Sequence, residues 1–346
     1  MYLCKEDNKL VESLKKIDEN SHGILFVIDE KEHLIGTVTD GDIRRWLLKT
    51  GDLSAEVRCF MNEKPLALQK NAADTSESFM KKNDITAVPI IDSHNRIKDI
   101  HFLIRNEAEK SLIKNLENVT VCIMAGGKGT RLKPYTNILP KPLIPIGDIP
   151  IAERIIENFE KFGAKKFYMT VNYKKKMIQS YFADSDREKC IEYLEESEPL
   201  GTAGSLSMLP DGGKEPIFVS NCDILIKANY NDIYDFHLKM ENDMTVVTAL
   251  KNIVVPYGVI LSSENGLIEA VDEKPQLSYL VNTGFYVLSP KAVSMVPKNR
   301  EYHMTDLMTD LIAEGRKVAM YPVSEDSFLD MGEFEEMARM EQKLNK

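Results

Sequence analysis

The sequence of 346 residues has no long apolar run, and its first residues carry no apolar segment. No window approaches the ~20 consecutive apolar residues that a membrane-spanning helix needs. The opening MYLCKEDNKL also lacks the apolar core of a signal peptide. We therefore expect a cytoplasmic protein with no membrane partner.

Cysteine is scarce, and the sequence contains no CxxC pair. An odd number of widely spaced cysteines argues against a disulfide framework and against a structural zinc site. The histidines are scattered as well, and neither HExxH nor GxSxG occurs. The motifs of zinc and serine hydrolases are therefore absent. The five cysteines are Cys4, Cys59, Cys122, Cys190 and Cys222.

Basic residues are in the minority, since 44 Lys and Arg face 54 Asp and Glu, which gives a net charge of −10. A nucleic-acid partner is excluded on this ground, because a phosphate backbone is bound by a surplus of Lys and Arg. A mononucleotide needs only a few backbone amides and local cations, so it remains allowed. The length predicts two or three domains, and 43% hydrophobic residues are enough for packed cores.

The first part of the chain contains an internal repeat. GILFVIDEKEHLIGTV, from Gly23, and TAVPIIDSHNRIKDIHF, from Thr86, share a strand, an Asp turn and a second strand. An offset of 63 places Ile28 on Ile91. Helix-like segments precede the two strand pairs, at Lys9–Asp18 and Ala72–Lys82.

A different pattern begins at Val119, after a charged segment, Ile104–Asn118, that we interpret as a linker helix. Strands and helices alternate from there, which predicts a mostly parallel sheet covered by helices. The expected strands are VTVCIM, Lys166–Val171, Ile217–Ser220, Met244–Leu250 and Phe285–Leu288; the expected helices are Ile149–Phe162, Ile233–Glu241, Thr305–Glu314 and Gly332–Asn345.

The strongest functional signal is AGGKGTRLKPYTNILPKPLIPI, directly after the first of these strands. Gly126, Gly127 and Gly129 let the backbone approach a phosphate and turn its N–H groups toward it. Arg131 offers a fork of donors for phosphate oxygens. Lys141 stands between two prolines that hold the segment extended. The spacing fits neither a Walker loop nor a GxGxxG fingerprint.

This run resembles the signature of the sugar-1-phosphate nucleotidyltransferases, over residues 119–346. Further family motifs follow in the expected order, namely EPLGTAGSL, VSNCDIL, PYGVI, DEKP with NTGFYVL, and LDMGEFEEM. The resemblance implies a Rossmann-like nucleotidyltransferase domain with a mostly parallel mixed sheet. It also implies transfer of a nucleoside monophosphate from an NTP to a sugar 1-phosphate, with release of pyrophosphate.

Each motif residue receives an expected role from the resemblance. Asp223 and Asp330, each after an apolar strand, would bind Mg²⁺, which prefers oxygen ligands. Arg131, Lys141 and Lys274 would neutralise phosphate charge, so the expected catalytic residues are Arg131, Lys141, Asp223 and Lys274. The expected nucleotide-binding residues are Ala125, Gly126, Gly127, Gly129, Thr130, Glu196, Gly201 and Thr202; those for the sugar phosphate are Gly258, Glu273, Lys274, Asn282 and Thr283.

Glu196 bears on the choice of base. The resembling thymidylyltransferases carry an amide at the matching position, whereas an ionised carboxylate only accepts hydrogen bonds. Guanine offers two adjacent donors, so Glu196 favours GTP over dTTP and UTP. The alternative is that Glu196 is one of several solvated acids in this segment.

The repeat of residues 1–104 resembles a tandem pair of CBS domains, an α+β module, joined by residues 105–118 to the domain at 119–346. In GTVTDGDIRRWL, Thr39 and Asp42 match the positions that contact an adenine nucleotide in that family. A helix capping box explains the same pattern. The second repeat has Phe102 and Arg105 there. Self-association through either domain is expected.

The whole chain resembles the glucosamine-1-phosphate guanylyltransferases of bacterial legionaminic acid synthesis. GDP-glucosamine is therefore the favoured product. Mannose- or heptose-1-phosphate guanylyltransferases, glucose-1-phosphate thymidylyl- or uridylyltransferases, and a non-catalytic nucleotide-sensing scaffold are the alternatives.

Overall fold

The computed structural model describes residues 2–20, 22–69, 75–83, 85–103, 116–184, 190–210, 214–332 and 334–344. Its contacts divide the chain into two compact units, Met1–Lys110 with Leu250–Leu280, and Ser111–Ala249 with Val281–Lys346. Most of the predicted linker helix lies outside the described residues. The domain limits given above stay predictions, and each unit is described by itself.

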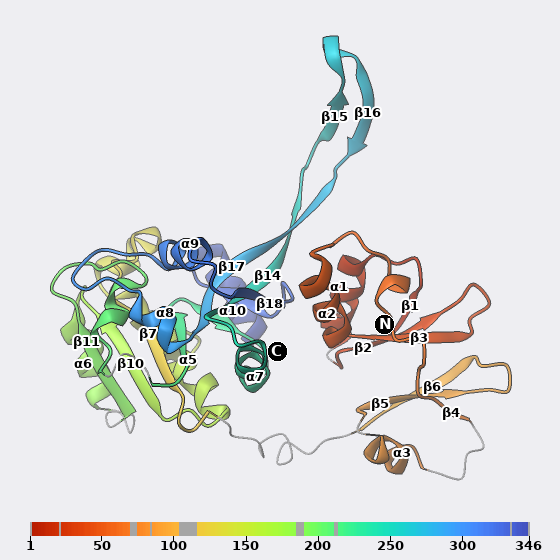
Figure 1. Cartoon of the computed structure of the whole chain (residues 1–346), viewed down its shortest axis with the longest axis horizontal. Helices are drawn as coiled ribbons and strands as arrows, with labels where there is room; N and C mark the ends of the chain where they lie inside the picture. Colours follow the sequence, from red (N-terminus) through yellow and green to blue (C-terminus); the bar gives the residue numbers. More distant parts are fainter. Residues whose placement is uncertain are drawn as a thin grey trace. The chain divides into compact units, whose positions relative to one another are not determined.

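The second unit is built on a seven-stranded sheet (Figure 1). Parallel pairs join β7 to β10 and to β12, β10 to β11, and β14 to β18, while β12 and β17 are antiparallel. The predicted mostly parallel mixed sheet is therefore confirmed. The strand order is β11 (Ile191–Glu195), β10 (Lys166–Val171), β7 (Thr120–Met124), β12 (Ile217–Asn221), β17 (Gln276–Leu288), β14 (Met244–Val254) and β18 (Val318–Val323).

Helices cover both faces of this sheet, which explains why its strands are continuous apolar runs. Alternate residues of β7 enter opposite hydrophobic clusters, Val121 and Ile123 on one face, Cys122 and Met124 on the other. The first cluster includes residues of α5 (Ile151–Lys161), α6 (Lys175–Ala183), α7 (Tyr230–Met240) and α10 (Phe334–Leu344); the second includes residues of η6 (Gly204–Met208), α8 (Pro290–Ser294) and α9 (Met304–Ala313).

Two short strand pairs complete this unit. β13 (Ile224–Ile226) pairs with β19 (Phe328–Asp330) directly beyond the end of β12. The predicted helix Ile149–Phe162 begins later, at Ile151, because Ile149–Pro150 forms β9 against β8 (Pro145–Ile146).

The first unit contains the repeat as two three-stranded sheets of the same order. In each, the first strand is parallel to the second, and the second is antiparallel to the third. The strands are β1 (Leu3–Lys5), β2 (Ile24–Ile28) and β3 (Leu34–Thr39), then β4 (Leu68–Gln69), β5 (Ala87–Ile91) and β6 (Ile97–Phe102); the helices are α1 (Leu10–Asn20), α2 (Asp40–Thr50) and α3 (Ser76–Lys82), with the short η1 (Val57–Cys59).

The offset of 63 recurs in the strand register. Ile28 pairs with Leu34 after a bulge, and Ile91 pairs with Ile97 after the equivalent bulge. The repeats meet at equivalent positions, since His33 bridges Arg96. The repeat inferred from the sequence is therefore confirmed as two similarly folded halves.

A further β-hairpin, formed by two strands of the segment Gly258–Glu273, was not predicted from the sequence. β15 (Gly258–Ser262) and β16 (Ile268–Glu273) pair antiparallel, joined by η8 (Glu264–Gly266). Apart from Val259, every residue of its two strands is exposed. Three of the predicted sugar-phosphate residues, Gly258, Glu273 and Lys274, lie on or beside this hairpin.

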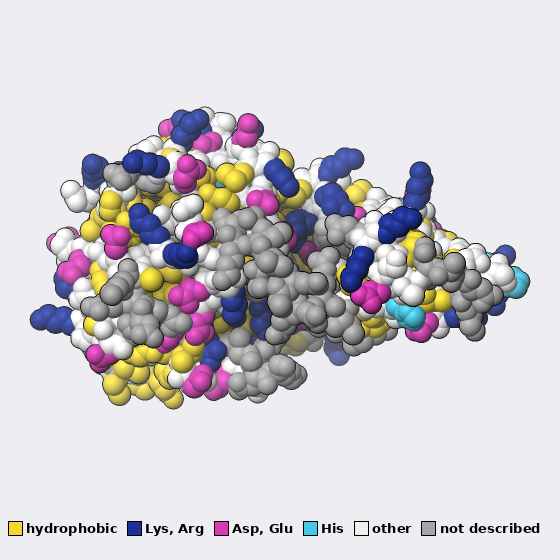
Figure 2. Space-filling view, turned by 90° about the horizontal axis from the view of Figure 1, so that it is seen from below, with side chains coloured by type: hydrophobic (Ala, Val, Ile, Leu, Met, Phe, Trp, Pro, Cys, Tyr) yellow, Lys and Arg dark blue, Asp and Glu magenta, His cyan; other side chains and the backbone are white. Residues whose placement is uncertain are grey.

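Surface composition agrees with the mixed charge of the sequence. On the face drawn in Figure 2, basic and acidic side chains are interspersed over the described surface. Among the described helices, none combines the length and the apolar character needed to cross a membrane.

Acid should destabilise the second unit through His237 of α7. This side chain is buried against Thr245, with Nδ1 2.9 Å from the hydroxyl oxygen. Burial lowers the pKa of His237 to about 4, against the opposing effect of Asp243. The unfolded chain, with a histidine pKa of about 6.5, takes up the proton first, so stability falls between pH 6.5 and 4, by about 3 kcal/mol.

The measurement is urea unfolding of the wild type and of His237→Gln at several pH values. The variant should start less stable at pH 7 and lose less between pH 6.5 and 4. Parallel pH curves for the two proteins would contradict the assignment.

Candidate active site

The glycine loop begins where β7 ends, at the carboxyl edge of the sheet. The Ala125 amide donates to the Thr170 hydroxyl of β10 at 3.0 Å, which fixes the start of the loop. Gly129 has φ 62°, and a Cβ there would lie 2.9 Å from the Thr136 side chain. Only glycine accommodates this turn without strain.

Lys141 and Asp223 form a buried ion pair at the same edge. Lys141 follows Pro140 in the short helix η4 (Lys141–Leu143), and Asp223 comes two residues after the end of β12. Each residue is only 8% exposed. The pair therefore fastens the proline-rich segment to the sheet and compensates two charges that burial would otherwise penalise.

Asp330 lies beside Asp223. It pairs with Ile224 across β13 and β19, and the Met331 amide donates to the Asp223 carbonyl at 2.8 Å. Burial and the Asp223 charge raise the pKa of Asp330 above its usual range. Arg131 is close too, because a Cβ at Gly332 would lie near both its guanidinium and the Asp330 carboxylate.

These two carboxylates fit the chemistry of Mg²⁺. They concentrate negative charge that a divalent cation would neutralise, and Mg²⁺ usually takes one or two carboxylates plus phosphates and waters. No cluster of three or more His, Cys, Asp or Glu suited to a metal occurs within the described residues. Any metal here would therefore complete its shell with substrate oxygens and waters.

Glu196 occupies the opposite part of the site and is 5% exposed. Its Oε1 accepts from the Ser205 hydroxyl at 2.6 Å, and its Oε2 accepts from the Leu200 amide at 3.3 Å. A Cβ at Gly126 would come within 2.7 Å of Oε1, so the glycine leaves room for the carboxylate. Each carboxylate oxygen has a second lone pair to offer a ligand.

The loop that follows Glu196 is held by a distant segment. Gly201 has φ 79°, and a Cβ there would lie 2.6 Å from the Tyr302 carbonyl. That carbonyl accepts from the amides of Ala203 and Gly204, and the Thr202 hydroxyl accepts from the Met304 amide.

One cavity of about 370 Å³ brings these groups together. Most of the predicted catalytic and nucleotide-binding residues line it: Gly126, Gly127, Gly129, Thr130, Arg131, Lys141, Glu196, Gly201, Thr202 and Asp223. Sequence reasoning did not find the other lining residues, which are Met124, Thr170, Pro199, Asn221, Cys222 and Glu301.

None of the five predicted sugar-phosphate residues lines this cavity, and the predicted catalytic residue Lys274 is one of them. The Thr283 hydroxyl is buried and donates to the Val247 carbonyl at 2.7 Å, within the sheet. Asn282 is exposed, and its side chain accepts from the Gly284 amide. The sugar-binding roles of these residues, and of the three at the hairpin, stay predictions.

A family model described as nucleotidyl transferase matches residues 120–346, which is more than half of the chain. The chain belongs to the nucleotidyl transferase family. A second model, described as CBS domain, matches residues 1–49.

Curated members of the family resemble the chain over part of their length. A protein of Oryza sativa subsp. japonica, named probable mannose-1-phosphate guanylyltransferase 3, is 28% identical over 220 residues, covering 61% of this chain and 60% of the relative. A UTP–glucose-1-phosphate uridylyltransferase of Synechocystis sp. is 31% identical over 231 residues, covering 61% and 59%. The chain thus spans about three-fifths of these two relatives.

Two solved structures share the fold. The crystal structure of HddC from Yersinia pseudotuberculosis has a TM-score of 0.52 at 23% identity, covering 65% of this chain and 99% of that chain. A putative glucose-1-phosphate thymidylyltransferase from Bacillus anthracis has a TM-score of 0.52 at 20% identity, covering 65% and 94%.

The predicted adenine-nucleotide residues of the CBS region form a capping box at the start of α2. The Thr39 hydroxyl oxygen accepts from the Asp42 amide, and the Asp42 carboxylate accepts from the Thr39 amide. Asp42 also pairs with Arg45. The structural alternative is therefore present, while adenine-nucleotide binding and self-association stay predictions.

Removing the Lys141 ammonium should destabilise this nucleotidyl transferase strongly. Lys141→Met leaves Asp223 buried without its partner and next to Asp330, so we expect a loss of roughly 3–5 kcal/mol in urea unfolding. Adding Asp223→Asn should restore part of that loss.

The matched control is Lys165→Met, since Lys165 pairs with Glu117 on the surface. Its loss should stay below about 1 kcal/mol. An equally small loss for Lys141→Met would show that the buried pair adds nothing to stability.

Proposed function

We propose that the protein is an Mg²⁺-dependent sugar-1-phosphate nucleotidyltransferase that uses GTP. The main observation in support is that the glycine loop, Lys141 and Asp223 line one common cavity. Membership of the nucleotidyl transferase family supports the reaction class.

The reaction needs positioning and charge neutralisation more than covalent help from the protein. A phosphate oxygen of the sugar 1-phosphate attacks the α-phosphorus of the NTP. The bond from that phosphorus to the bridging oxygen breaks, pyrophosphate leaves with the electron pair, and a nucleoside-diphosphate sugar forms.

Each group of this chain has a task in that displacement. Backbone amides of the loop at Gly126–Gly129 face the triphosphate, and Arg131 binds its outer oxygens. Lys141 neutralises charge near the α-phosphate. Asp223 and Asp330 would hold Mg²⁺, which when bound offsets the charge on the phosphates.

Removing the Asp223 carboxylate, which is proposed to bind Mg²⁺, should affect pyrophosphate release much more than nucleotide binding. Asp223→Asn should lower pyrophosphate release at least roughly 100-fold, because a metal supplies several kcal/mol of charge stabilisation. Nucleotide binding should persist, because asparagine keeps the side-chain volume and an oxygen that can accept from Lys141, and because Glu196 and the glycine loop are unchanged. Pyrophosphate release and equilibrium nucleotide binding are the two measurements.

Chelation of Mg²⁺ with EDTA should have the same effect on the wild type. Asp148→Asn serves as the control, since Asp148 is an exposed carboxylate paired with Arg154. Unchanged release in Asp223→Asn would refute the metal assignment and favour the non-catalytic sensing role.

Glu196 supports guanine as the base. Its carboxylate lines the cavity beside Gly126 and has acceptor capacity beyond the bonds from Ser205 and Leu200. Guanine presents N1–H and the 2-amino group side by side, which matches two carboxylate oxygens. Thymine and uracil present one N–H between two carbonyls and would face repulsion there.

Exchanging this carboxylate for an amide should change base preference. Glu196→Gln should lower kcat/KM for GTP roughly 10- to 100-fold, the effect of an unmade buried hydrogen bond, and should improve the ratio of dTTP to GTP use. Turnover with each of five NTPs is the assay.

Glu195→Gln is the matched control, because the adjacent Glu195 is exposed and pairs with Lys175. It should keep the wild-type base preference. Wild-type turnover with dTTP or UTP but not with GTP would overturn the guanine assignment.

For the acceptor, the favoured substrate is glucosamine 1-phosphate, within legionaminic acid synthesis. The likeness of the two-part arrangement, a CBS region before the transferase, supports it. Mannose 1-phosphate is the next candidate, since several curated relatives are named mannose-1-phosphate guanylyltransferases; heptose 1-phosphate follows. A panel of sugar 1-phosphates in the same assay decides between them.

A further inference from the structure

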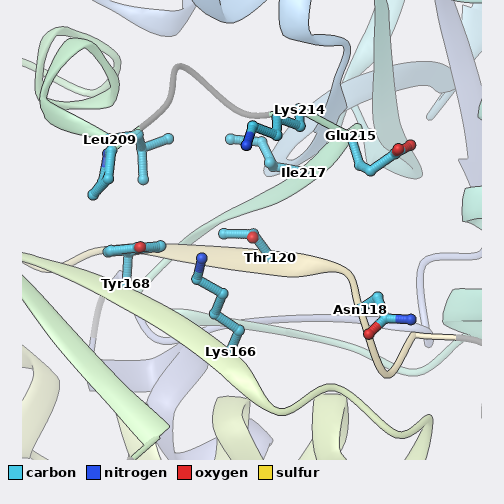
Figure 3. A pocket seen from close by; sticks show the side chains of 9 residues that line it. Asn118, Thr120, Lys166, Tyr168, Leu209, Lys214, Glu215 and Ile217 are labelled. Atoms are coloured by element: carbon cyan, nitrogen blue, oxygen red, sulfur yellow. The ribbon is translucent and has the colours of Figure 1, made fainter.

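A second cavity, of about 170 Å³, opens at the other end of the sheet (Figure 3). The first residues of three neighbouring parallel strands line it: Thr120 of β7, Lys166 of β10 and Ile217 of β12. Leu209 and Lys214, which both precede β12 in the chain, lie on the facing side of the cavity.

This cavity is separate from the candidate active site. The same three strands reach that site four residues later, and a strand rises about 3.3 Å per residue, so about 13 Å separates the two strand ends. Between the two ends, these strands carry buried side chains that belong to one hydrophobic cluster. The residues lining the active-site end are Met124, Thr170 and Asn221. Cys122 and Val219 lie between the two cavities, and Tyr168, of the same cluster, also lines the second cavity.

Two ammonium groups come to this cavity from opposite walls. Lys166 extends from β10, and in Figure 3 Lys214 lies on the opposite side of the cavity. In Figure 3 the Glu215 carboxylate points away from both of them. The Lys166 ammonium lies 5.3 Å from the centre of the Tyr168 ring, a cation–π contact that holds it at the cavity.

Neutral hydrogen-bonding groups accompany these cations. Thr120 and Tyr168 belong to the lining, and the hydroxyl of each can donate a hydrogen bond. Leu209 and Ile217 add an apolar wall beside the polar groups. The cavity therefore combines donors for an anion with a surface for a carbon skeleton.

We propose that this cavity binds the phosphate group of a small phosphomonoester. The phosphate oxygens accept from Lys166, Lys214 and the hydroxyls, and the carbon part of the ligand lies against Leu209 and Ile217. The volume equals that of about six waters, enough for a phosphate with a few attached atoms. This site goes beyond the proposed transfer reaction and does not depend on it.

The test is a lysine footprint on the full-length protein. Acetylation rates of individual lysines are measured by mass spectrometry with inorganic phosphate, with glycerol 2-phosphate, with glycerol, and with chloride at matched ionic strength. Both phosphates should slow acetylation of Lys166 and Lys214 but not of the neighbouring Lys165. Glycerol 2-phosphate should protect at the lower concentration, and glycerol should not protect.

Variants show whether the two lysines act together. In Lys166→Met, the protection of Lys214 should be lost at the same phosphate concentration, with an apparent dissociation constant raised roughly tenfold or more. Lys166→Arg should keep the protection, and so should Lys165→Met. These lysines are exposed, so the substitutions should leave the fold intact.

Several results would overturn the proposal. Equal slowing of all surface lysines, or undiminished protection of Lys214 in Lys166→Met, would show general screening instead of a site. Protection by phosphate but not by glycerol 2-phosphate would overturn the phosphomonoester assignment. Pyrophosphate release is not the readout, so failure here and failure of the proposed transferase activity are distinguishable.

Discussion

The buried ion pair between Lys141 and Asp223 is the interaction on which the candidate active site depends. It joins a proline-rich segment to the carboxyl end of β12, from positions 82 residues apart in the chain. It also balances charge where Asp223 and Asp330 lie together; burial, and then the nearby Asp223 charge, raise the pKa of Asp330. In the proposed reaction the two side chains would exchange partners. The Asp223 carboxylate would bind the metal cation, and the Lys141 ammonium would bind a phosphate. In the structure the pair thus holds together the two segments that would bind the phosphates.

The sequence could predict those site residues whose position is set by the local sequence, but not those placed by contacts between distant segments. Lys141 and Asp223 could be assigned because they stand in motifs of a family that the sequence resembles, and because parallel strands end at one edge of the sheet. Thr170 could not, since its place depends on which strands neighbour β7. Glu301 could not either, because backbone hydrogen bonds of Tyr302 bring its segment to the loop at Gly201.

The same distinction applies to the fold. Lys166–Val171 is a strand as predicted, because the part that is buried on both faces, from Phe167 on, is mostly apolar. The hairpin of β15 and β16 escaped prediction because its strands are exposed, so no buried face imposes an alternating pattern. The repeat was visible because its halves use equivalent residues, although Phe102 stands in the second half where the first half has Thr39.

The net charge of this protein bears on the binding of polyanions, whereas the local charge of a cavity bears on the binding of a single phosphate. A surplus of ten acidic residues repels a polyanion, whose many phosphates meet the averaged surface. A single phosphate meets only the groups within a few ångströms, since charges farther away than about 8–10 Å are screened by salt. The strands of one sheet can therefore place cations at both ends, Lys141 beyond the carboxyl end and Lys166 at the amino end, in a chain that is acidic overall. The fold allows this because loops begin at both ends of each strand, where polar side chains can reach solvent. The middle of each strand is buried and stays apolar.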